Sequence, residues 1–448
     1  MKRITIILIL VFLLGTMPKE IYAEQPTIEE LLEEIQALKV RVAELEKKLV
    51  EKTPETQLSK KEIEKHVDSH LLHRIEGIEL PGGLRMGVGG TFVFQGTPNA
   101  NNVGTGEDSV FDASYKANIE IEKEFNDWGL AFAELEVGEN AAIEDELSVF
   151  SNVNRAAADT GSSVELAKLW YEHYFLQKQL TLTGGKLEAA DYMDQNEYAY
   201  DENTQFLSHM FRNSPVIEFP DGNGPGLDAV LCFEPIHFIE LSGGIFEGDA
   251  DWEDIFNGLF YIAQINLKPD VLFNLDEDAK AGNYRIYAWI NDNHHAKLTP
   301  EGISATDTKD MNYGFGLSIS QALGDTFGVF SRLGWQRPNI ALLDGSATLE
   351  WAWSAGMEIN GKYWKRENDV LAFAVGQTFP SDEWKDSSNN NYGGAEGHIE
   401  TYYNCRLNKY LAITPDIQFI WNPNGINKSS DGDDDVIFVY GARGQIDF

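Results

Sequence analysis

Apolar and polar residues alternate strictly along the last stretch of the chain, residues 436–448. Counting back from Phe448, every second residue is apolar or small, whereas Arg443, Gln445 and Asp447 lie between them. A period of two predicts a β-strand with two unlike faces. A strand of a soluble antiparallel sheet and a strand of a membrane barrel both show this alternation. The other segments of the chain must therefore distinguish these two fold classes.

About sixteen alternating segments follow residue 84, and short turns alternate between them with long loops. Short turns on one side and long loops on the other are typical of transmembrane β-barrels. In lipid every backbone N–H and C=O must be paired, so such a sheet has to close. The predicted strands begin near Leu84, Asp112, Leu130, Glu165, Leu180, Gly226, His237, Gly258, Gly282, Met311, Thr326, Leu349, Asn368, Gly397, Lys409 and Asp435.

The fold class predicted from this pattern is all-β. It is a roughly 16-stranded antiparallel transmembrane β-barrel over residues 84–448, preceded by an α-helical coiled coil. About sixteen strands leave room for an aqueous channel, which explains polar residues on the inner face of the barrel.

Residues 1–23 have the pattern of a secretory signal peptide. Lys2 and Arg3 precede an apolar core over residues 4–15, and a cleavage site is expected after Ala23. The apolar core is too short to span a membrane as a helix. The mature chain is therefore expected beyond the cytoplasmic membrane.

Residues 24–52 follow a heptad pattern that predicts a periplasmic coiled coil. Its narrow apolar seam needs a partner helix, and the sequence has no second heptad run, so the expected partner is another copy of the chain. A homo-oligomer follows, with a trimer favoured; a lone amphipathic helix lying on the barrel or on another envelope protein is the alternative. The seam consists of Ile28, Leu31, Ile35, Leu38, Val42, Leu45 and Leu49.

Residues 53–83 are expected to form a linker with one short helix. Its histidines, His66, His70 and His73, have a spacing that can present a metal site. Exposed histidines on a solvated helix are the favoured interpretation, so no metal site is predicted there.

Composition narrows the function classes. The formal net charge of the 448-residue chain is −37, which argues against nucleic-acid binding because phosphate is repelled. Cys232 and Cys405 have no zinc-type spacing; a disulfide between them stays open. The acidic run at residues 431–435 is interpreted as a surface loop rather than a calcium loop. No cofactor is expected.

Strand parity predicts which charged and aromatic side chains face the lumen. A cluster of arginines opposite loop carboxylates would create a transverse field that favours polar solutes. Plain solvation of a wet wall is the alternative, and a shift of one residue would turn any of these strands inside out. The predicted pore-lining residues are Arg85, Lys168, Trp170, Glu172, Arg285, Trp289, Arg332, Glu400, Arg406 and Arg443.

The long segment after Lys186 is rich in carboxylates, amides and aromatic residues. Carboxylates and amides bind hydroxyl groups, and aromatic faces stack on sugar rings. Long loops of this kind are often functional. These side chains could instead only pin the loop to the wall. The candidate pore-constriction contacts are Asp191, Asp194, Asn196, Asp201, Glu202 and Gln205.

The run over residues 194–207, with Asn213-Ser-Pro and Glu218-Phe-Pro, resembles the carbohydrate-selective porin family (OprB-like). So do the preceding strands around Lys168-Leu-Trp-Tyr-Glu and Leu182-Thr-Gly-Gly-Lys. The resemblance implies a sixteen-stranded porin whose infolded loops narrow the channel. The coiled coil stands where some members carry a cell-wall-binding module, and the layout is also similar to siderophore porins with an N-terminal coil.

The resemblance implies a non-enzymatic outer-membrane porin that passes small hydrophilic solutes, carbohydrates first among them. The terminal Phe448 resembles the assembly signal of such barrels, so the expected partners are outer-membrane lipid, the barrel assembly machinery and the solute. Three alternatives stay open: uptake of a ferric siderophore, a structural tether between the outer membrane and the cell wall, and an outer-membrane enzyme.

Overall fold

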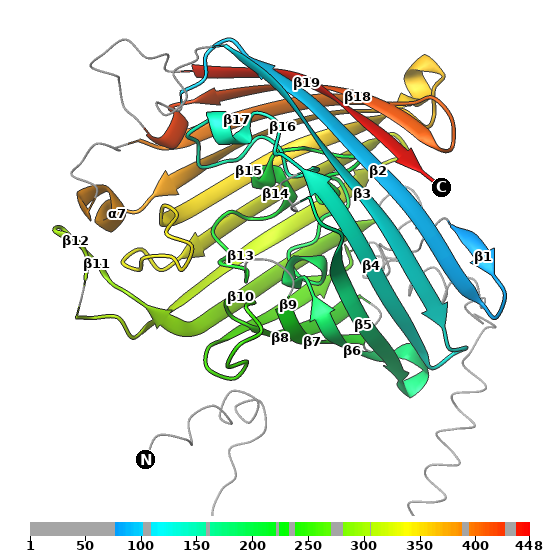
Figure 1. The fold of residues 1–448 in the computed structure, drawn as a ribbon, viewed down its shortest axis with the longest axis horizontal. Helices are drawn as coiled ribbons and strands as arrows, with labels where there is room; N and C mark the ends of the chain where they lie inside the picture. Colours follow the sequence, from blue (N-terminus) through cyan, green and yellow to red (C-terminus); the bar gives the residue numbers. More distant parts are fainter. Residues whose placement is uncertain are drawn as a thin grey trace, which may run out of the picture. The chain divides into compact units, whose positions relative to one another are not determined.

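The computed structural model describes residues 77–448 except for 102–108, 158–161, 221–223, 233–237, 270–280, 305, 388–393 and 426–435. Within these residues, sixteen antiparallel strands form one sheet that closes on itself, because each strand pairs with the next and β19 pairs with β2 (Figure 1). The barrel strands are β2 (Leu84–Thr97), β3 (Val110–Glu124), β4 (Gly129–Glu139), β5 (Glu165–Phe175), β6 (Leu180–Leu187), β7 (Gly224–Cys232), β8 (Ile239–Glu247), β9 (Leu259–Leu267), β10 (Gly282–His295), β13 (Asp310–Leu323), β14 (Phe327–Gln336), β15 (Leu349–Asn360), β16 (Val370–Pro380), β17 (Glu396–Arg406), β18 (Leu411–Trp421) and β19 (Val436–Asp447).

The remaining described elements are short. They are the strands β1 (Ile78–Leu80), β11 (Leu298–Thr299) and β12 (Gly302–Ile303), the helices α4 (His209–Arg212) and α7 (Asp382–Ser387), and the 3-10 turns η1 (Glu144–Glu146), η2 (Leu176–Lys178), η3 (Ala189–Asp191), η4 (Gly361–Trp364) and η5 (Pro423–Gly425). Among the described residues, no helix is long and apolar enough to cross a membrane.

The structure confirms the predicted antiparallel barrel of about sixteen strands, whereas the coiled coil predicted before it lies outside the described residues. The predicted start of each of the sixteen strands lies within two residues of the start of the corresponding observed strand. One element was not predicted: β1 lies in the segment assigned to the linker and pairs with the start of β2, with Leu80 opposite Leu84.

Several predictions concern residues outside the described part of the chain. These are the signal peptide, the coiled coil with its seam, the three linker histidines and the acidic run at residues 431–435. Cys405 has a free thiol, whereas the side chain of Cys232 lies outside the described set.

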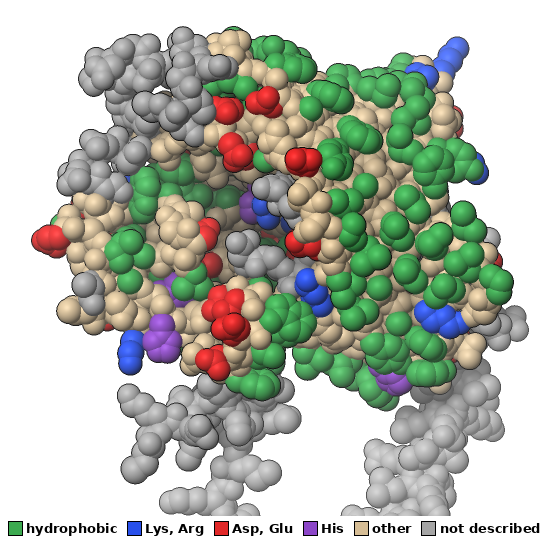
Figure 2. Space-filling view, in the orientation of Figure 1, with side chains coloured by type: hydrophobic (Ala, Val, Ile, Leu, Met, Phe, Trp, Pro, Cys, Tyr) green, Lys and Arg blue, Asp and Glu red, His purple; other side chains and the backbone are tan. Residues whose placement is uncertain are grey.

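The outer surface of the barrel is apolar. Large hydrophobic side chains such as Phe92, Phe315 and Phe373 are exposed on it, and Figure 2 shows hydrophobic side chains spread over the outer wall. Water-soluble proteins rarely expose contiguous apolar surface of this kind. The alternation therefore places the apolar face outward and the polar face inward.

Two loops fold into the barrel and fill part of its interior. The infolded loop, residues 188–220, connects β6 to β7, and the second loop, residues 140–157, lies between β4 and β5. Phe206 and Phe211 of the infolded loop pack against Phe330 and Tyr402 of the inner wall. The inner face thus carries apolar residues at this place, where the loop covers it, which explains the departures from strict polar-in alternation there.

Candidate functional site

Asp201 and Gln205 shape one turn of the infolded loop. The Gln205 Oε1 atom accepts hydrogen bonds from the backbone N–H groups of Tyr200 (2.7 Å) and Asp201 (3.0 Å). The Asp201 carboxylate accepts from the backbone N–H of Asn203 (2.9 Å) and from the Thr204 hydroxyl (2.6 Å). Both side chains are therefore engaged within the loop itself.

Asp194 and Arg332 join the infolded loop to β14. Arg332 Nε lies 3.3 Å from Asp194 Oδ1, and Asp194 Oδ2 accepts from the backbone N–H of Ser214 at 2.6 Å. The same guanidinium donates to the carbonyl of Phe211. Burial raises the pKa of the Asp194 carboxyl above its ordinary value, although Arg332 opposes that shift.

Asn196 attaches the loop to β13. Its Nδ2 atom donates to the Ser318 hydroxyl and to the Ile319 carbonyl, both at 3.1 Å, and its Oδ1 accepts from the N–H of Tyr198. The Asn196 side chain is buried. Like Asp194, it holds the loop against the wall.

Arg285 and Glu197 form an ion pair whose two members differ in exposure. Arg285 Nη2 lies 2.7 Å from Glu197 Oε1, and Arg285 also donates to the carbonyl of Gln195. The arginine side chain is 7% exposed and the glutamate side chain is 36% exposed. The glutamate is therefore the more accessible member of this pair, and its carboxylate also accepts hydrogen bonds from Asn283 and Ser320 of the wall.

Lys168 of β5 binds the start of the infolded loop. Its Nζ lies 2.5 Å from Asp191 Oδ2 and 3.4 Å from Glu188 Oε2. The Tyr200 hydroxyl donates to the other oxygen of Asp191 at 2.6 Å. The Asp191 carboxylate thus bridges the strand and two parts of the loop.

Arg212 lies between two loop carboxylates. Its guanidinium is 2.9 Å from Glu188 and 2.7 Å from Glu202, and it stacks over the ring of Tyr200 at 5.2 Å. Burial opposes ionisation of Glu202, yet Arg212 and Lys116 hold its pKa at about 2. The Arg212 side chain is 6% exposed and that of Glu188 is 26% exposed, so the accessible charge is again negative.

Glu400 and Arg443 hold the backbone of the infolded loop. Glu400 accepts from the backbone N–H groups of Leu207 (2.6 Å) and Ser208 (3.1 Å). Arg443 Nη1 donates to the carbonyl of Gln205 at 2.9 Å. Backbone contacts of this kind fix the path of the loop independently of its side chains.

The other predicted pore-lining residues interact with neighbouring strands or lie at the end of their own. Arg406 is exposed at the end of β17. The remaining contacts are the ion pair of Arg85 with Glu122 at 3.1 Å, the stacking of Trp170 on Phe132 at 5.0 Å, the hydrogen bond from Thr183 to Glu172 at 3.1 Å, and the stacking of Trp289 on Phe260 at 5.8 Å.

Sequence reasoning missed three side chains of this site, namely Glu188, Glu197 and Arg212. Strand parity could not select them, because they lie in a loop. One signal was available: Arg212 is the single lysine or arginine in residues 188–220. An isolated cation in so acidic a loop is expected to gather carboxylates around it.

The site therefore consists of a loop held to the wall by buried cations, with carboxylates at its accessible edge. Figure 2 shows the hollowed face of the barrel, in which side chains of both charges lie. Accessible carboxylates can accept hydrogen bonds from hydroxyl groups and attract cations.

A family model described as "Carbohydrate-selective porin, OprB family" matches residues 131–448. The chain belongs to this family. It is accordingly a porin of the outer membrane, and the OprB family and its fold are those of channel proteins.

Individual proteins similar to this OprB-family porin share 10–25% sequence identity with it. The high-pH structure of Pseudomonas putida OprB has a TM-score of 0.64 and 14% identity, covering 82% of this chain and 94% of that chain. The outer-membrane channel DcaP of Acinetobacter baumannii has a TM-score of 0.49 and 10% identity, covering 83% and 99%. An uncharacterized protein of Aquifex aeolicus is 25% identical over 257 residues, which is 56% of this chain and 70% of that protein.

Proposed function

We propose that this OprB-family porin lets small hydrophilic solutes, carbohydrates first among them, diffuse across the outer membrane past the infolded loop. One observation carries the proposal: in a loop fixed to the inner wall, the acidic side chains of Glu188 and Glu197 are more accessible than their buried arginine partners. The family description supports a carbohydrate as the solute.

The chemistry of the loop edge suits a sugar. Ionised carboxylates accept hydrogen bonds from hydroxyl groups, and the half-buried ring of Tyr198 offers an apolar face to a sugar ring. We assign direct solute contact to Glu188, Glu197 and Tyr198. The predicted constriction residues Asp191, Asp194, Asn196, Asp201, Glu202 and Gln205 then set the shape of the constriction, because their contacts lie within the loop and with the wall.

Block of ion current tests this function. The mature protein is inserted in a planar bilayer, and maltose-type sugars are added while single-channel current is recorded. We expect stepwise conductance that sugar reduces in a saturable way. Glu197→Gln should weaken the block, whereas Glu301→Gln, which neutralises an exposed acid in the turn between β11 and β12, should leave it unchanged.

The outcomes separate the alternatives. Conductance that a ferric siderophore blocks and sugars do not would replace the carbohydrate proposal with iron uptake. Conductance indifferent to both would make the protein a general pore. An absence of conductance in a correctly folded sample would reject the proposal altogether.

We further propose that residues 24–52 join copies of the chain as a periplasmic coiled coil, with a trimer favoured. The seven-residue seam from Ile28 to Leu49 supports this assembly. Leu38→Asp would place a charge in that seam, and native mass measurement in detergent should then report monomers. Unchanged oligomers would reject the coil as the cause of assembly, and sugar block should persist in either case.

The terminal Phe448 is proposed as the signal recognised by the barrel assembly machinery. Its aromatic ring directly after the last barrel strand, β19, supports this role. Phe448→Ala should lower the amount of folded barrel in cells. An unaffected yield would reject the assignment.

A further inference from the structure

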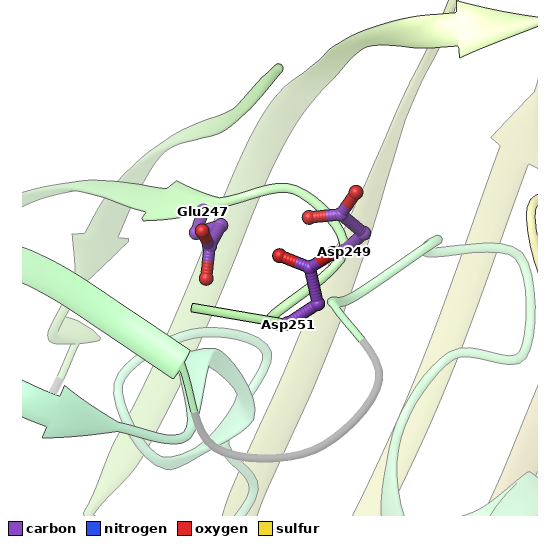
Figure 3. Close-up of side chains that lie close together, drawn as sticks. All are labelled: Glu247, Asp249 and Asp251. Atoms are coloured by element: carbon purple, nitrogen blue, oxygen red, sulfur yellow. The ribbon is translucent and has the colours of Figure 1, made fainter. Parts of the chain in front are cut away.

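Three carboxylates converge where β8 ends and its loop to β9 begins. Glu247 is the last residue of β8, and Asp249 and Asp251 follow in the loop (Figure 3). One carboxylate oxygen of each residue lies within 4.8 Å of the others. The arrangement belongs to a long connection of the barrel, on the side that faces the cell exterior in outer-membrane proteins.

Glu247 differs from an ordinary surface acid because it is buried. The residue is 2% exposed, and its Oε1 atom has no hydrogen-bond partner among the described residues. Its Oε2 atom accepts one hydrogen bond, from the backbone N–H of Trp252 at 2.9 Å. A buried carboxylate oxygen without a partner is costly, which indicates a cationic ligand at that place.

The protein itself supplies no compensating cation that the structure describes. None of the ion pairs among the described residues involves Glu247, Asp249 or Asp251. The approach of three like charges therefore calls for a counter-charge from outside the chain.

The base of the loop is held in place before any ligand binds. The backbone N–H of Gly248 donates to the carbonyl of Gly258 at 3.1 Å, and the Gly248 carbonyl accepts from Asn291 of β10 at 3.3 Å. Asp249 and Asp251 thus follow a backbone segment that is already fixed to the wall. Little conformational entropy is therefore lost when a ligand binds to them.

We propose that Glu247, Asp249 and Asp251 bind a calcium ion that ties the loop between β8 and β9 to the barrel rim. Calcium coordinates oxygen ligands at about 2.3–2.6 Å, so oxygens on opposite sides of one ion lie about 4.8 Å apart. The spacing of this cluster meets that limit. A loop with exposed aspartates also suits the flexible coordination of calcium better than the strict octahedron of magnesium.

Terbium luminescence tests the site in the full mature protein in detergent. Terbium replaces calcium in oxygen sites, and Trp252, one residue after Asp251, can sensitise its emission. After removal of divalent ions with EDTA, we expect saturable emission that calcium suppresses at lower concentration than magnesium. Calcium binding itself is measured by calorimetry, with an expected Kd of about 0.1–1 mM, typical of extracellular sites.

Matched variants distinguish a specific calcium site from nonspecific attraction of calcium to an acidic surface. Asp249→Asn and Asp251→Asn should each weaken calcium binding about tenfold. Asp254→Asn makes the same charge change in the same loop outside the cluster and should stay within about twofold of the parent. Heat-modified migration in gels verifies that each variant is a folded barrel.

Two results would overturn the proposal. The first is an absence of saturable calcium binding up to about 10 mM, far above the expected range. The second is an equal loss of affinity in Asp254→Asn and in the two cluster variants, since that pattern indicates a general acidic surface. Because neither result involves solute flux, the test is independent of the proposed transport function.

Discussion

Arg332 of β14 and Asp194 of the infolded loop form an ion pair that is buried on both sides, with 3.3 Å between Nε and Oδ1. The guanidinium also donates to the carbonyls of Phe211 and Asp194, so it satisfies the loop backbone as well as the carboxylate. Burying such a pair is tolerable only when both members are present. The arginine of this wall therefore acts on the loop and not directly on a solute.

Removal of the arginine should release the infolded loop. Arg332→Met leaves the Asp194 carboxylate buried without its cation, which costs about 3–5 kcal/mol. We expect the loop to leave the wall, giving larger and noisier single-channel conductance. Arg332→Met with Asp194→Asn should recover part of the parent behaviour, because no uncompensated charge remains.

The matched control for this change is Arg406→Met, which removes an exposed arginine at the end of β17. It should leave the conductance as in the parent protein. If Arg332→Met conducted like the parent while folding normally, the ion pair would not be what fixes the loop.

Ion selectivity should follow the accessible carboxylates of the loop edge. Because Glu188 and Glu197 are more exposed than Arg212 and Arg285, the channel is expected to prefer cations. Reversal potentials in a potassium chloride gradient measure this preference. Glu188→Gln with Glu197→Gln should lower the cation-to-anion permeability ratio by about twofold or more. An anion-selective parent channel would contradict this expectation.

The strands could be predicted because each one carries its own local signal. Along β19, Arg443 and Gln445 alternate with apolar or small residues, and that period fixes both the strand and its faces. Closure of the sheet into a barrel was predicted because every backbone N–H and C=O must be paired in lipid, and not from any particular residue.

The contacts of the infolded loop could not be predicted, because a loop has no period. Parity predicts that Arg332 faces a wet lumen, whereas in the structure its side chain is buried against the infolded loop. That it meets Asp194 depends on a contact between residues 138 positions apart. Glu247 is a second example, since the alternation of β8 predicts neither its burial nor the approach of Asp249 and Asp251 to it.

Docking of the second loop should depend on pH through Glu144. Its Oε2 atom accepts from the backbone N–H groups of Val153 (2.7 Å) and Asn154 (3.2 Å). Burial raises the pKa of Glu144 to about 7, although those two N–H groups oppose the shift. The docked loop therefore binds more protons than the free loop between pH 4.5 and about 7, so docking is strongest below that range and weakens as pH rises through 7.

Hydrogen exchange at the amides of Val153 and Asn154 measures this effect. Protection in the parent should fall as pH rises from about 5 to 8, relative to Glu144→Gln at the same pH. Comparing the two proteins at each pH cancels the intrinsic pH dependence of exchange. His209 should not contribute, because burial lowers its pKa to about 3 and keeps it neutral in this range. Equal protection in both proteins at every pH would exclude Glu144 as the titrating group.

Gly328 of β14 provides the space in which the ring of Tyr198 rests against the wall. A Cβ atom at Gly328 would overlap with Tyr198 Cε1, so Gly328→Ala must push the ring away. If that ring stacks on sugar, Gly328→Ala and Tyr198→Ala should both weaken sugar block, by about 1 kcal/mol or roughly fivefold in affinity. Gly444→Ala is the matched control, since a Cβ there meets no atom within 4 Å. Titration of sugar block in the three variants makes the measurement, and unchanged affinity in both test variants would remove Tyr198 from the solute path.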